Sequence, residues 1–562
     1  MHKLYSVFAL ISTAAFAQQA APPKPAIVDG AVVNSITREP LRKVELTLST
    51  SFMTEDMEKA MAQFGGDSAN AASPGAPKTV RKSFAAATDA SGKFHFEVEP
   101  GDYYLKAKHA GYGDVTYKPQ GKYALEGKVH LQAGDELTQV TLRMVPHGAV
   151  SGRVIDEDGD PVSSAMVTAQ TYMYGNGRKH LVPVDTGQTN DRGEYRLGKL
   201  PPGHYYLTAS ALNVNPLAEA PPPPKDGSPE TGYVATYYPK ATNIDQAGAI
   251  DVAAAADLPG FEIQLQKSRV VRIKGKAVGE DGAPLKTAQI MLMSAGNLGS
   301  MQMRMLNDPQ GRFEIANIQP GTYIAMTMQM GGSSPTMHMQ TLVVPAEGIG
   351  DLVLGGQKDG SVKGRVAVSG NGKVALGGLR VQLSGDMDSP VMPAAAGVSE
   401  SGEFTVNKVA PQPYQVSMAV VPEGAYLKSV RWQDREMLGK PVDFSAGFAG
   451  TLEVTLGTDG GQFETTVSRD DKPVSGATVL LIAADPNARF PAATRTAETD
   501  AAGHVLMKDI APGDYLAFAW EDVEEQAWSD PAFLKPLEAQ ATSVTVHPGG
   551  HEKAEVKLIA SK

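Results

Sequence analysis

Methionine is the residue type whose placement in this chain most suggests chemistry. Ten of the 22 Met residues fall between positions 291 and 339, where most alternate with other residues as on one face of a β-strand. Thioethers together with an imidazole select soft metals, Cu(I) above all. The residues that would hold the metal are Met326, Met328, Met330, Met337, His338 and Met339. Two other interpretations stay open: packing against a neighbouring domain or covering loop, and binding of an apolar partner.

Aromatic rings form a second group that could bind a ligand. Exposed Trp and Tyr rings can stack on the apolar faces of sugars, whereas a ring at a domain junction instead buries a large area. The segment from Trp520 to Pro531 leaves a strand and enters an acidic loop, so we expect it to be a presented surface. The ligand-binding candidates are Trp520, Trp528, Tyr233, Tyr237 and Tyr238, within a wider set that includes Trp432 and Phe533.

Catalytic groups do not stand out by type or spacing. None of the 11 His residues begins a His-x-x-Glu or His-Glu-x-x-His arrangement of the kind that holds catalytic zinc, and the chain has no Cys nucleophile. Asp156, Asp158 and Asp160 are read as turn residues, with a weak calcium site as the alternative. We therefore expect neither an enzyme nor a bound cofactor.

The elements that must position these residues repeat five times. In each copy a Gly-x-aromatic or Gly-x-apolar phrase is followed by a Pro-x-x-Tyr turn, which is Pro-Gly-x-Tyr in four copies, and an Asp or Asn precedes the Gly in most of them. From the residue after Gly-x to the closing Tyr the interval is nine residues in the first copy and ten in the others. Such spacing predicts a unit of turn, strand, turn and strand. The paired phrases begin at Gly92 and Pro100, Gly193 and Pro202, Gly311 and Pro320, Gly402 and Pro411, and Gly503 and Pro512.

A second phrase lies upstream of the repeated pair. Residues 152–162 read Gly-Arg-Val-Ile-Asp-Glu-Asp-Gly-Asp-Pro-Val and match residues 275–285. In this order the motifs resemble the carboxypeptidase regulatory-like domain, a prealbumin-like module grouped with the carbohydrate-binding-like folds. The resemblance covers nearly all of the mature chain and implies an exported bacterial repeat protein built from accessory modules rather than a peptidase.

The fold class that follows is all-β, a tandem array of about five small antiparallel seven-stranded prealbumin-like sandwiches. Residues 50–83 are an insertion with a short helix expected at 53–64, and residues 213–239 are a Pro-rich insertion. The expected divisions are a signal peptide at 1–17, a linker at 18–26, and sandwiches at 27–146, 147–268, 269–357, 358–458 and 459–562.

The net charge of the chain and its predicted export limit the kinds of partner that we expect. A charged start, an apolar stretch and an Ala-x-Ala site at 15–17 predict a signal peptide, and hence a protein of the periplasm, the outer surface or the medium. No later segment is apolar enough to predict an integral membrane protein. A net charge of −11 argues against a nucleic-acid partner.

Two non-catalytic functions remain from the sequence. The first is binding of carbohydrate, either a polysaccharide or peptidoglycan, through aromatic surfaces. The second is a structural or interaction scaffold for cell-envelope proteins. Soft-metal binding by the third sandwich is a further hypothesis.

Overall fold

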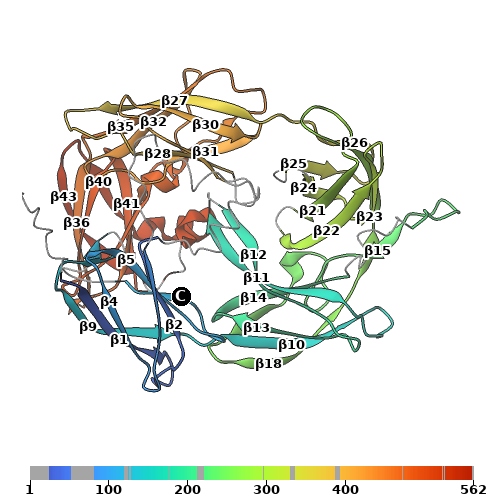
Figure 1. Cartoon of the computed structure of the whole chain (residues 1–562), viewed down its shortest axis with the longest axis horizontal. Helices are drawn as coiled ribbons and strands as arrows, with labels where there is room; N and C mark the ends of the chain where they lie inside the picture. Colours follow the sequence, from blue (N-terminus) through green and yellow to red (C-terminus); the bar gives the residue numbers. More distant parts are fainter. Residues whose placement is uncertain are drawn as a thin grey trace, which may run out of the picture. The chain divides into compact units, whose positions relative to one another are not determined.

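The computed structural model describes residues 24–51, 82–118, 124–125, 128–175, 178–211, 221–294, 297–329, 336–385, 393–470, 472–521, 523 and 526–559. These residues form small sheets that pair into sandwiches (Figure 1). In sandwich 5 the pairing of β41 (Gly513–Trp520) with β43 (His551–Ile559) joins the two sheets into one of eight strands. The predicted all-β fold of tandem sandwiches is confirmed. The expected signal peptide and the expected helix at 53–64 lie outside the described residues.

The first sheet of each sandwich has the same plan. Its central strand is the first strand of the unit, flanked by an antiparallel strand on one side and by the last, parallel strand on the other. In sandwich 1 the strands are β4 (Lys93–Val98), β1 (Ala26–Asn34) and β9 (Glu136–Met144); in sandwich 2, β13 (Glu194–Leu200), β10 (Gly148–Ile155) and β18 (Asp257–Gln264); and in sandwich 3, β23 (Arg312–Ile318), β20 (Val271–Val278) and β26 (Ile349–Gly355). In sandwich 4 they are β30 (Glu403–Val409), β27 (Gly360–Ser369) and β35 (Thr451–Gly457), extended by β32 (Tyr426–Trp432) and β33 (Arg435–Glu436). In sandwich 5 they are β40 (His504–Ile510), β36 (Gly461–Arg469) and β43 (His551–Ile559), with β37 (Lys472–Pro473).

The second sheet is antiparallel and carries the strand that follows the Pro-x-x-Tyr turn. In sandwich 1 it holds β3 (Ser83–Ala87), β2 (Glu45–Ser49), β5 (Gly101–Lys108), β8 (Lys128–Leu131), β7 (Ala124–Leu125) and β6 (Val115–Thr116); in sandwich 2, β12 (Arg178–Gln188), β11 (Ala165–Gly175), β14 (Gly203–Ala211), β16 (Thr236–Tyr237) and β17 (Ala249–Val252); in sandwich 3, β22 (Asn297–Asn307), β21 (Thr287–Ser294), β24 (Gly321–Gln329) and β25 (Thr336–Val344); in sandwich 4, β29 (Ala394–Gly397), β28 (Arg380–Ser384), β31 (Pro413–Met418) and β34 (Val442–Asp443); and in sandwich 5, β39 (Arg495–Glu498), β38 (Thr478–Ala483), β41 (Gly513–Trp520) and β42 (Thr542–Val546).

Short elements lie between the strands. The two-stranded antiparallel sheet of β15 (Thr231–Tyr233) and β19 (Lys267–Arg269) lies beside the start of sandwich 3 in the sequence. The helical turns are η3 (Ile244–Gln246) in sandwich 2 and η4 (Pro486–Ala488), η5 (Pro491–Ala493), η6 (Ala527–Ser529), α2 (Pro531–Leu534) and η7 (Lys535–Gln540) in sandwich 5.

Every unit departs from the purely antiparallel sandwich that we expected, because it contains a parallel strand pair; sandwich 5 has a second one, between β41 and β43. The last strand pairs in parallel with the first, as β18 does with β10 and β26 with β20. A parallel neighbour needs a long crossover rather than a hairpin, and here the whole second sheet supplies that crossover. The parallel pair thus joins the two ends of each unit.

A side-chain oxygen organises the turn before each Gly-x-Phe phrase. Asn190 Oδ1 accepts from the backbone N–H groups of Arg192 and Glu194, at 2.9 Å each. Such an Asx turn is a short-range alternative to regular hydrogen bonding. The same pair of bonds is made by Asp89, Asp308 and Asp500, while Ser399 Oγ accepts one of them from Glu403.

The Gly of this turn lies against the first strand. Gly193 has φ +71°, and a Cβ at this position would lie 2.5 Å from the carbonyl oxygen of Val154. The other four copies have φ between +70° and +86° and equally close first-strand carbonyls. Both the left-handed backbone and the lack of space require Gly.

A Thr next to the turn holds the connection from the first strand to the second sheet, which the sequence reasoning missed. Thr189 Oγ1 accepts from the backbone N–H of Ala165 at 2.9 Å and donates to the carbonyl of Val162 at 2.7 Å. Thr88 and Thr499 make the equivalent bonds. A buried hydroxyl with both capacities used fixes the chain entering the second sheet.

The tyrosine of the Pro-x-x-Tyr turn bonds back to the turn in four of the five units. Tyr205 is buried, and its hydroxyl donates to the carbonyl of Pro201, four residues back, at 2.6 Å. Burial raises the pKa of this phenol. Tyr103, Tyr323 and Tyr515 bond back in the same way. After this Tyr, alternate residues enter the core, as predicted for Leu207 and Ala209.

Substitution of the turn glycine tests this plan. Gly193→Ala is expected to lower the local unfolding free energy of β10 and β13 by about 3 kcal/mol, from a strained φ and a steric clash. Gly159→Ala is the matched control, because Gly159 also has a positive φ (+87°) but no atom near its Cβ position, so the cost should be about 1 kcal/mol. Hydrogen exchange of the strand amides measures both. Equal losses of unfolding free energy in the two variants would show that the nearby Val154 carbonyl adds nothing to the cost of Gly193→Ala.

Candidate functional site

The second sheet of sandwich 3 assembles the methionines into one array. Strand pairing sets Met303, Met291, Met326 and Met339 side by side in one row across β22, β21, β24 and β25. The adjacent rows are Met305, Gln289, Met328 and Met337, and Met301, Met293, Ile324 and Thr341. Directly paired residues share a face of a sheet. These twelve positions, nine of them Met, are named the methionine face.

The opposite face of this sheet forms the core of sandwich 3. Ile290, Leu292 and Ala325 are buried there. On the methionine face exposure falls from the edge inward: Met301 and Met303 on β22 are 38% and 36% exposed, whereas Met326 in the middle is 8% exposed. Gln289 Nε2 donates to Met303 Sδ. The face is thus mostly apolar and rich in sulfur, with exposed positions on both edge strands, Met301 and Met303 on β22 and Thr341 on β25.

The imidazole expected in the metal set does not join it. His338 pairs with Thr327, and both lie on the core side of the sheet, opposite Met337 and Met339. The expected set of Met326, Met328, Met337, His338 and Met339 is therefore divided between two faces, because consecutive strand residues point to opposite sides. Met330 lies outside the described residues. The sequence showed the alternation but not the partner strands.

Trp520 does not present the ring face that sugar stacking needs. It is 2% exposed and packs with Phe518, at 5.4 Å between ring centroids and 6° between planes. Phe533 of α2 contacts its other side, and Leu534 completes this second core of sandwich 5. The apolar outer face of β41 is therefore covered by the segment η6–α2–η7 of the same unit, not by another sandwich.

The other aromatic candidates divide into buried and accessible rings. Tyr237 is buried near Leu181, Tyr238 packs on Phe261 at 5.2 Å, and Trp432 is buried against Phe444. Trp528 is half-buried at the edge of the second core of sandwich 5. The predicted set is thus spread over separate sites.

Tyr233 is held by two charged neighbours. Its hydroxyl donates to Glu157 Oε2 at 2.5 Å, and Lys267 Nζ lies 4.9 Å from the ring centroid. Lys267 also forms an ion pair with Glu157. The hydrogen bonds from Lys267 and Tyr233 lower the pKa of Glu157 to about 2. One face of the Tyr233 ring is therefore already occupied by a cation.

Oxygen and nitrogen ligands do not gather into a metal site. Asp156 Oδ1 accepts from the backbone N–H groups of Asp158 and Asp160, as a turn residue does. Over the described residues, no three His, Cys, Asp or Glu side chains lie close enough to hold an ion. The calcium alternative thus gains no support from this turn.

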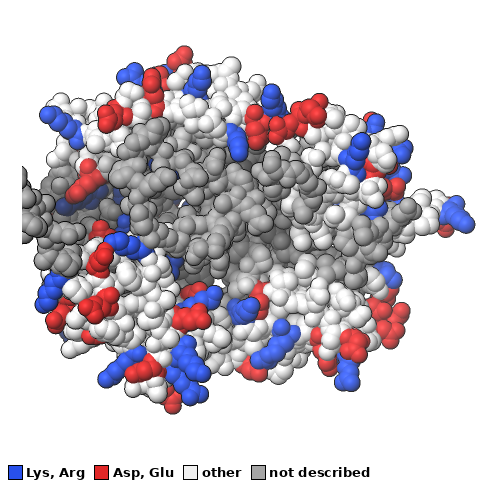
Figure 2. All heavy atoms as spheres, viewed as in Figure 1, with Lys and Arg blue, Asp and Glu red and all other residues white. Residues whose placement is uncertain are grey.

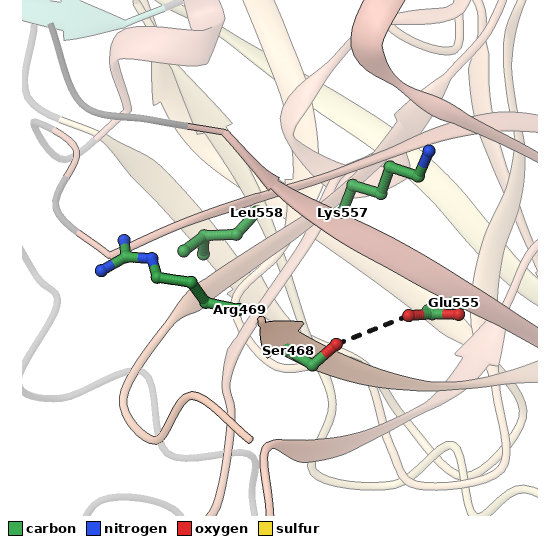
Figure 3. A pocket seen from close by; sticks show the side chains of 5 residues that line it. All are labelled: Ser468, Arg469, Glu555, Lys557 and Leu558. Atoms are coloured by element: carbon green, nitrogen blue, oxygen red, sulfur yellow. Dashed lines mark hydrogen bonds between the residues drawn. The ribbon is translucent and has the colours of Figure 1, made fainter. Parts of the chain in front are cut away.

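A small hollow on sandwich 5 brings polar groups together. It has a volume of about 200 Å³ and is lined by Ser468, Arg469, Glu555, Lys557 and Leu558 (Figure 3). Ser468 and Glu555 are 3.5 Å apart, which is longer than the contact of an activated nucleophile with its base. Arg469 forms an ion pair with Glu521. The hollow offers charge but no arrangement for nucleophilic catalysis.

The surface charges are mixed. On the face shown in Figure 2, positive and negative residues alternate across the part of the chain that the structure describes. Within that part, no helix is both long and apolar enough to span a bilayer.

Comparison with known proteins supports the fold. Residues 149–226 match the carboxypeptidase regulatory-like domain, which confirms the predicted resemblance for the first part of sandwich 2. No curated protein matches the chain.

The solved structures that match parts of this chain include three bacterial proteins. The TIE protein of Bacillus anthracis is 12% identical over 72% of this chain and 73% of its own, with a TM-score of 0.16. A minor pilin of Streptococcus agalactiae is 15% identical over 43% of this chain and 96% of its own, with a TM-score of 0.20. Two B repeat units of the Staphylococcus aureus collagen-binding protein are 12% identical over 77% of this chain and 100% of their own, with a TM-score of 0.13.

The low pKa of Glu157 gives a pH test of the Tyr233 contact. A carboxylate with a lowered pKa stabilises the fold above its unfolded pKa, near 4.5, and this contribution is lost as the pH falls toward about 2. We expect an NMR titration of the Glu157 carboxyl to give a midpoint near 2, and Tyr233→Phe to raise it. An unshifted midpoint in the unmodified chain would contradict the contact.

Proposed function

We propose that this protein is a non-catalytic scaffold of the bacterial cell envelope, in which tandem sandwiches hold docking surfaces at set spacings. The proposal rests on the junctions between sandwiches, which are short and which, between sandwiches 2 and 3 and between 4 and 5, are held by hydrogen bonds and packing. Within residues 147–562 the linkers are Val270 between β19 and β20, residues 356–359 and residues 458–460. A linker of so few residues limits the motion of the units it joins.

Arg272 braces the junction of sandwiches 2 and 3. The guanidinium contacts Glu230 at 2.6 Å, beside the β15 strand, and Glu314 at 2.7 Å on β23. It also donates to the carbonyl of Pro221. The Arg272 side chain is mostly buried, and its planar donors serve all three acceptors at once. The Pro-rich insertion is thereby fixed to the first sheet of sandwich 3.

Sandwiches 4 and 5 share a different brace. The backbone N–H of Gly424 donates to Asp509 Oδ2 at 3.0 Å, and Tyr426 donates to Asp459 Oδ1 at 2.9 Å. Phe490 packs on Gly439, where a Cβ would lie 2.4 Å from the ring. These contacts support a joint with one preferred geometry.

The aromatic residues support a scaffold better than a sugar-binding protein. The side chains of Trp520, Trp432 and Tyr237 are buried and so present no ring face to a sugar. Export to the periplasm, the outer surface or the medium remains part of the proposal, and its support is the signal-peptide pattern of residues 1–17. The proposed partners are other cell-envelope proteins.

A distance measurement tests the brace. Because the chain has no Cys, Lys199→Cys and Lys276→Cys place two spin labels on exposed positions of β13 and β20. We expect a narrow distance distribution that Arg272→Ala broadens, with a loss of about 2 kcal/mol in local stability. The matched control is Arg269→Ala, an exposed residue of β19. A broad distribution in the parent chain would contradict the scaffold.

Glycan binding remains the second proposed function, and accessible aromatic rings are its support. Trp528 and Tyr233 are half-buried at the edge of a core cluster, as is Tyr238, which packs on Phe261. Retention on immobilised polysaccharide or peptidoglycan that Trp528→Ala or Tyr233→Ala abolishes would establish it. Trp520→Ala is unsuitable, because loss of a core Trp costs about 3–5 kcal/mol.

A further inference from the structure

We infer that the methionine face of sandwich 3 is a binding site for a soft monovalent cation, Cu(I). The juxtaposition that carries this inference is the central row of four Met residues across four strands, with Met of a second row beside it. The site goes beyond the scaffold function and does not depend on it.

The spacing suits several thioethers on one ion. Directly paired residues of neighbouring strands have Cβ atoms about 4.5–5.5 Å apart. Met326 is paired with Met291 on one side and Met339 on the other, and Met328 with Met337. Each Met side chain has three rotatable bonds, so the sulfurs of three such neighbours can converge on one point above the sheet.

The donor set selects the kind of ion. Among the twelve positions, the side-chain groups other than sulfur that could bind a metal are the amide of Gln289 and the hydroxyl of Thr341. Hard cations such as Ca²⁺ and Mg²⁺ require several oxygens, and structural zinc requires thiolate or imidazole. Neutral thioethers instead match Cu(I).

The composition of the face adds to the case for a soft ion. Besides nine Met, the twelve positions hold one Gln, one Ile and one Thr, and no aromatic ring. What the nine positions share is a sulfur atom. The absence of Cys from the chain leaves Met as its sulfur ligand, one that forms no disulfides in an oxidising space.

The geometry gives an ion a way in. Met301 and Met303 are exposed on β22, next to Met293 and Met291. An ion bound first at this edge can pass to the buried Met326. The apolar surroundings then favour a low-charge ion over a divalent one, because burial of charge is costly.

Binding is measured with Ag(I), an air-stable ion of the same charge and softness, and then with Cu(I) under reducing, anaerobic conditions. Calorimetry of the full chain gives stoichiometry and affinity, and ¹³C-methyl NMR of Met identifies the ligands. We expect saturable binding of at least one ion, with shifts of the Met291, Met326 and Met339 methyls. Zn(II) should leave these signals unchanged.

Variants of equal volume assign the site. Met326→Leu with Met339→Leu keeps the packing, since Met-to-Leu exchanges are well tolerated, and should weaken binding at least tenfold. The matched control is Met173→Leu with Met437→Leu, on β11 and in sandwich 4, which should bind as the parent chain does.

Two results would overturn the inference. One is Ag(I) and Cu(I) binding that the Met326→Leu, Met339→Leu chain retains at parental affinity, with the same thermal unfolding midpoint. The other is no binding by the parent chain. If in that case an apolar peptide shifts the same methyl signals, the face is a docking surface instead.

Discussion

The close approach of the turn Gly to the first strand is the constraint on which every sandwich depends. Gly193 can lie against the carbonyl of Val154 because it has no Cβ, and Asn190 holds the turn in that position through two backbone N–H groups. The turn brings β13 beside β10, and the Tyr205 hydroxyl then closes the next turn. The close approach of the Gly recurs five times, and the pair of turn bonds and the Tyr bond recur in four of the five units. Each unit has its own core, and the chain has no Cys to form a disulfide.

With the inner faces committed to cores, the outer faces of the second sheets are free to differ. In sandwich 5 the outer face of β41 is apolar and is covered by α2 and its neighbours, which turns Phe518 and Trp520 into a second core. In sandwich 3 the equivalent face carries sulfur and stays open at the β22 edge. The same strand position therefore carries a covered apolar surface in sandwich 5 and a partly exposed methionine surface in sandwich 3. The fold that the two share does not by itself fix their function.

The periodicity of the repeat was enough to predict the fold, because turn residues and alternating strands are local signals. The core face of the strand after the Pro-x-x-Tyr turn was predicted residue by residue in the first, second and fifth copies, as Tyr205, Leu207 and Ala209 illustrate. Strand partners were not predictable, since pairing is non-local. For that reason the methionine grid emerged only in three dimensions. Burial of Trp520 by a segment that follows it was missed for the same reason. His338 was included in the expected metal set, although strand alternation alone separates it from Met337 and Met339.

Single-molecule stretching of the full chain tests the central claim, five sandwiches each held by its own turn and core. The account predicts a series of separate unfolding steps, each releasing the chain of one sandwich at about 3.5 Å per residue. Gly193→Ala should weaken one step and leave the others unchanged. A single rupture that releases the whole chain at once, or a weakening shared by all steps, would contradict independent units.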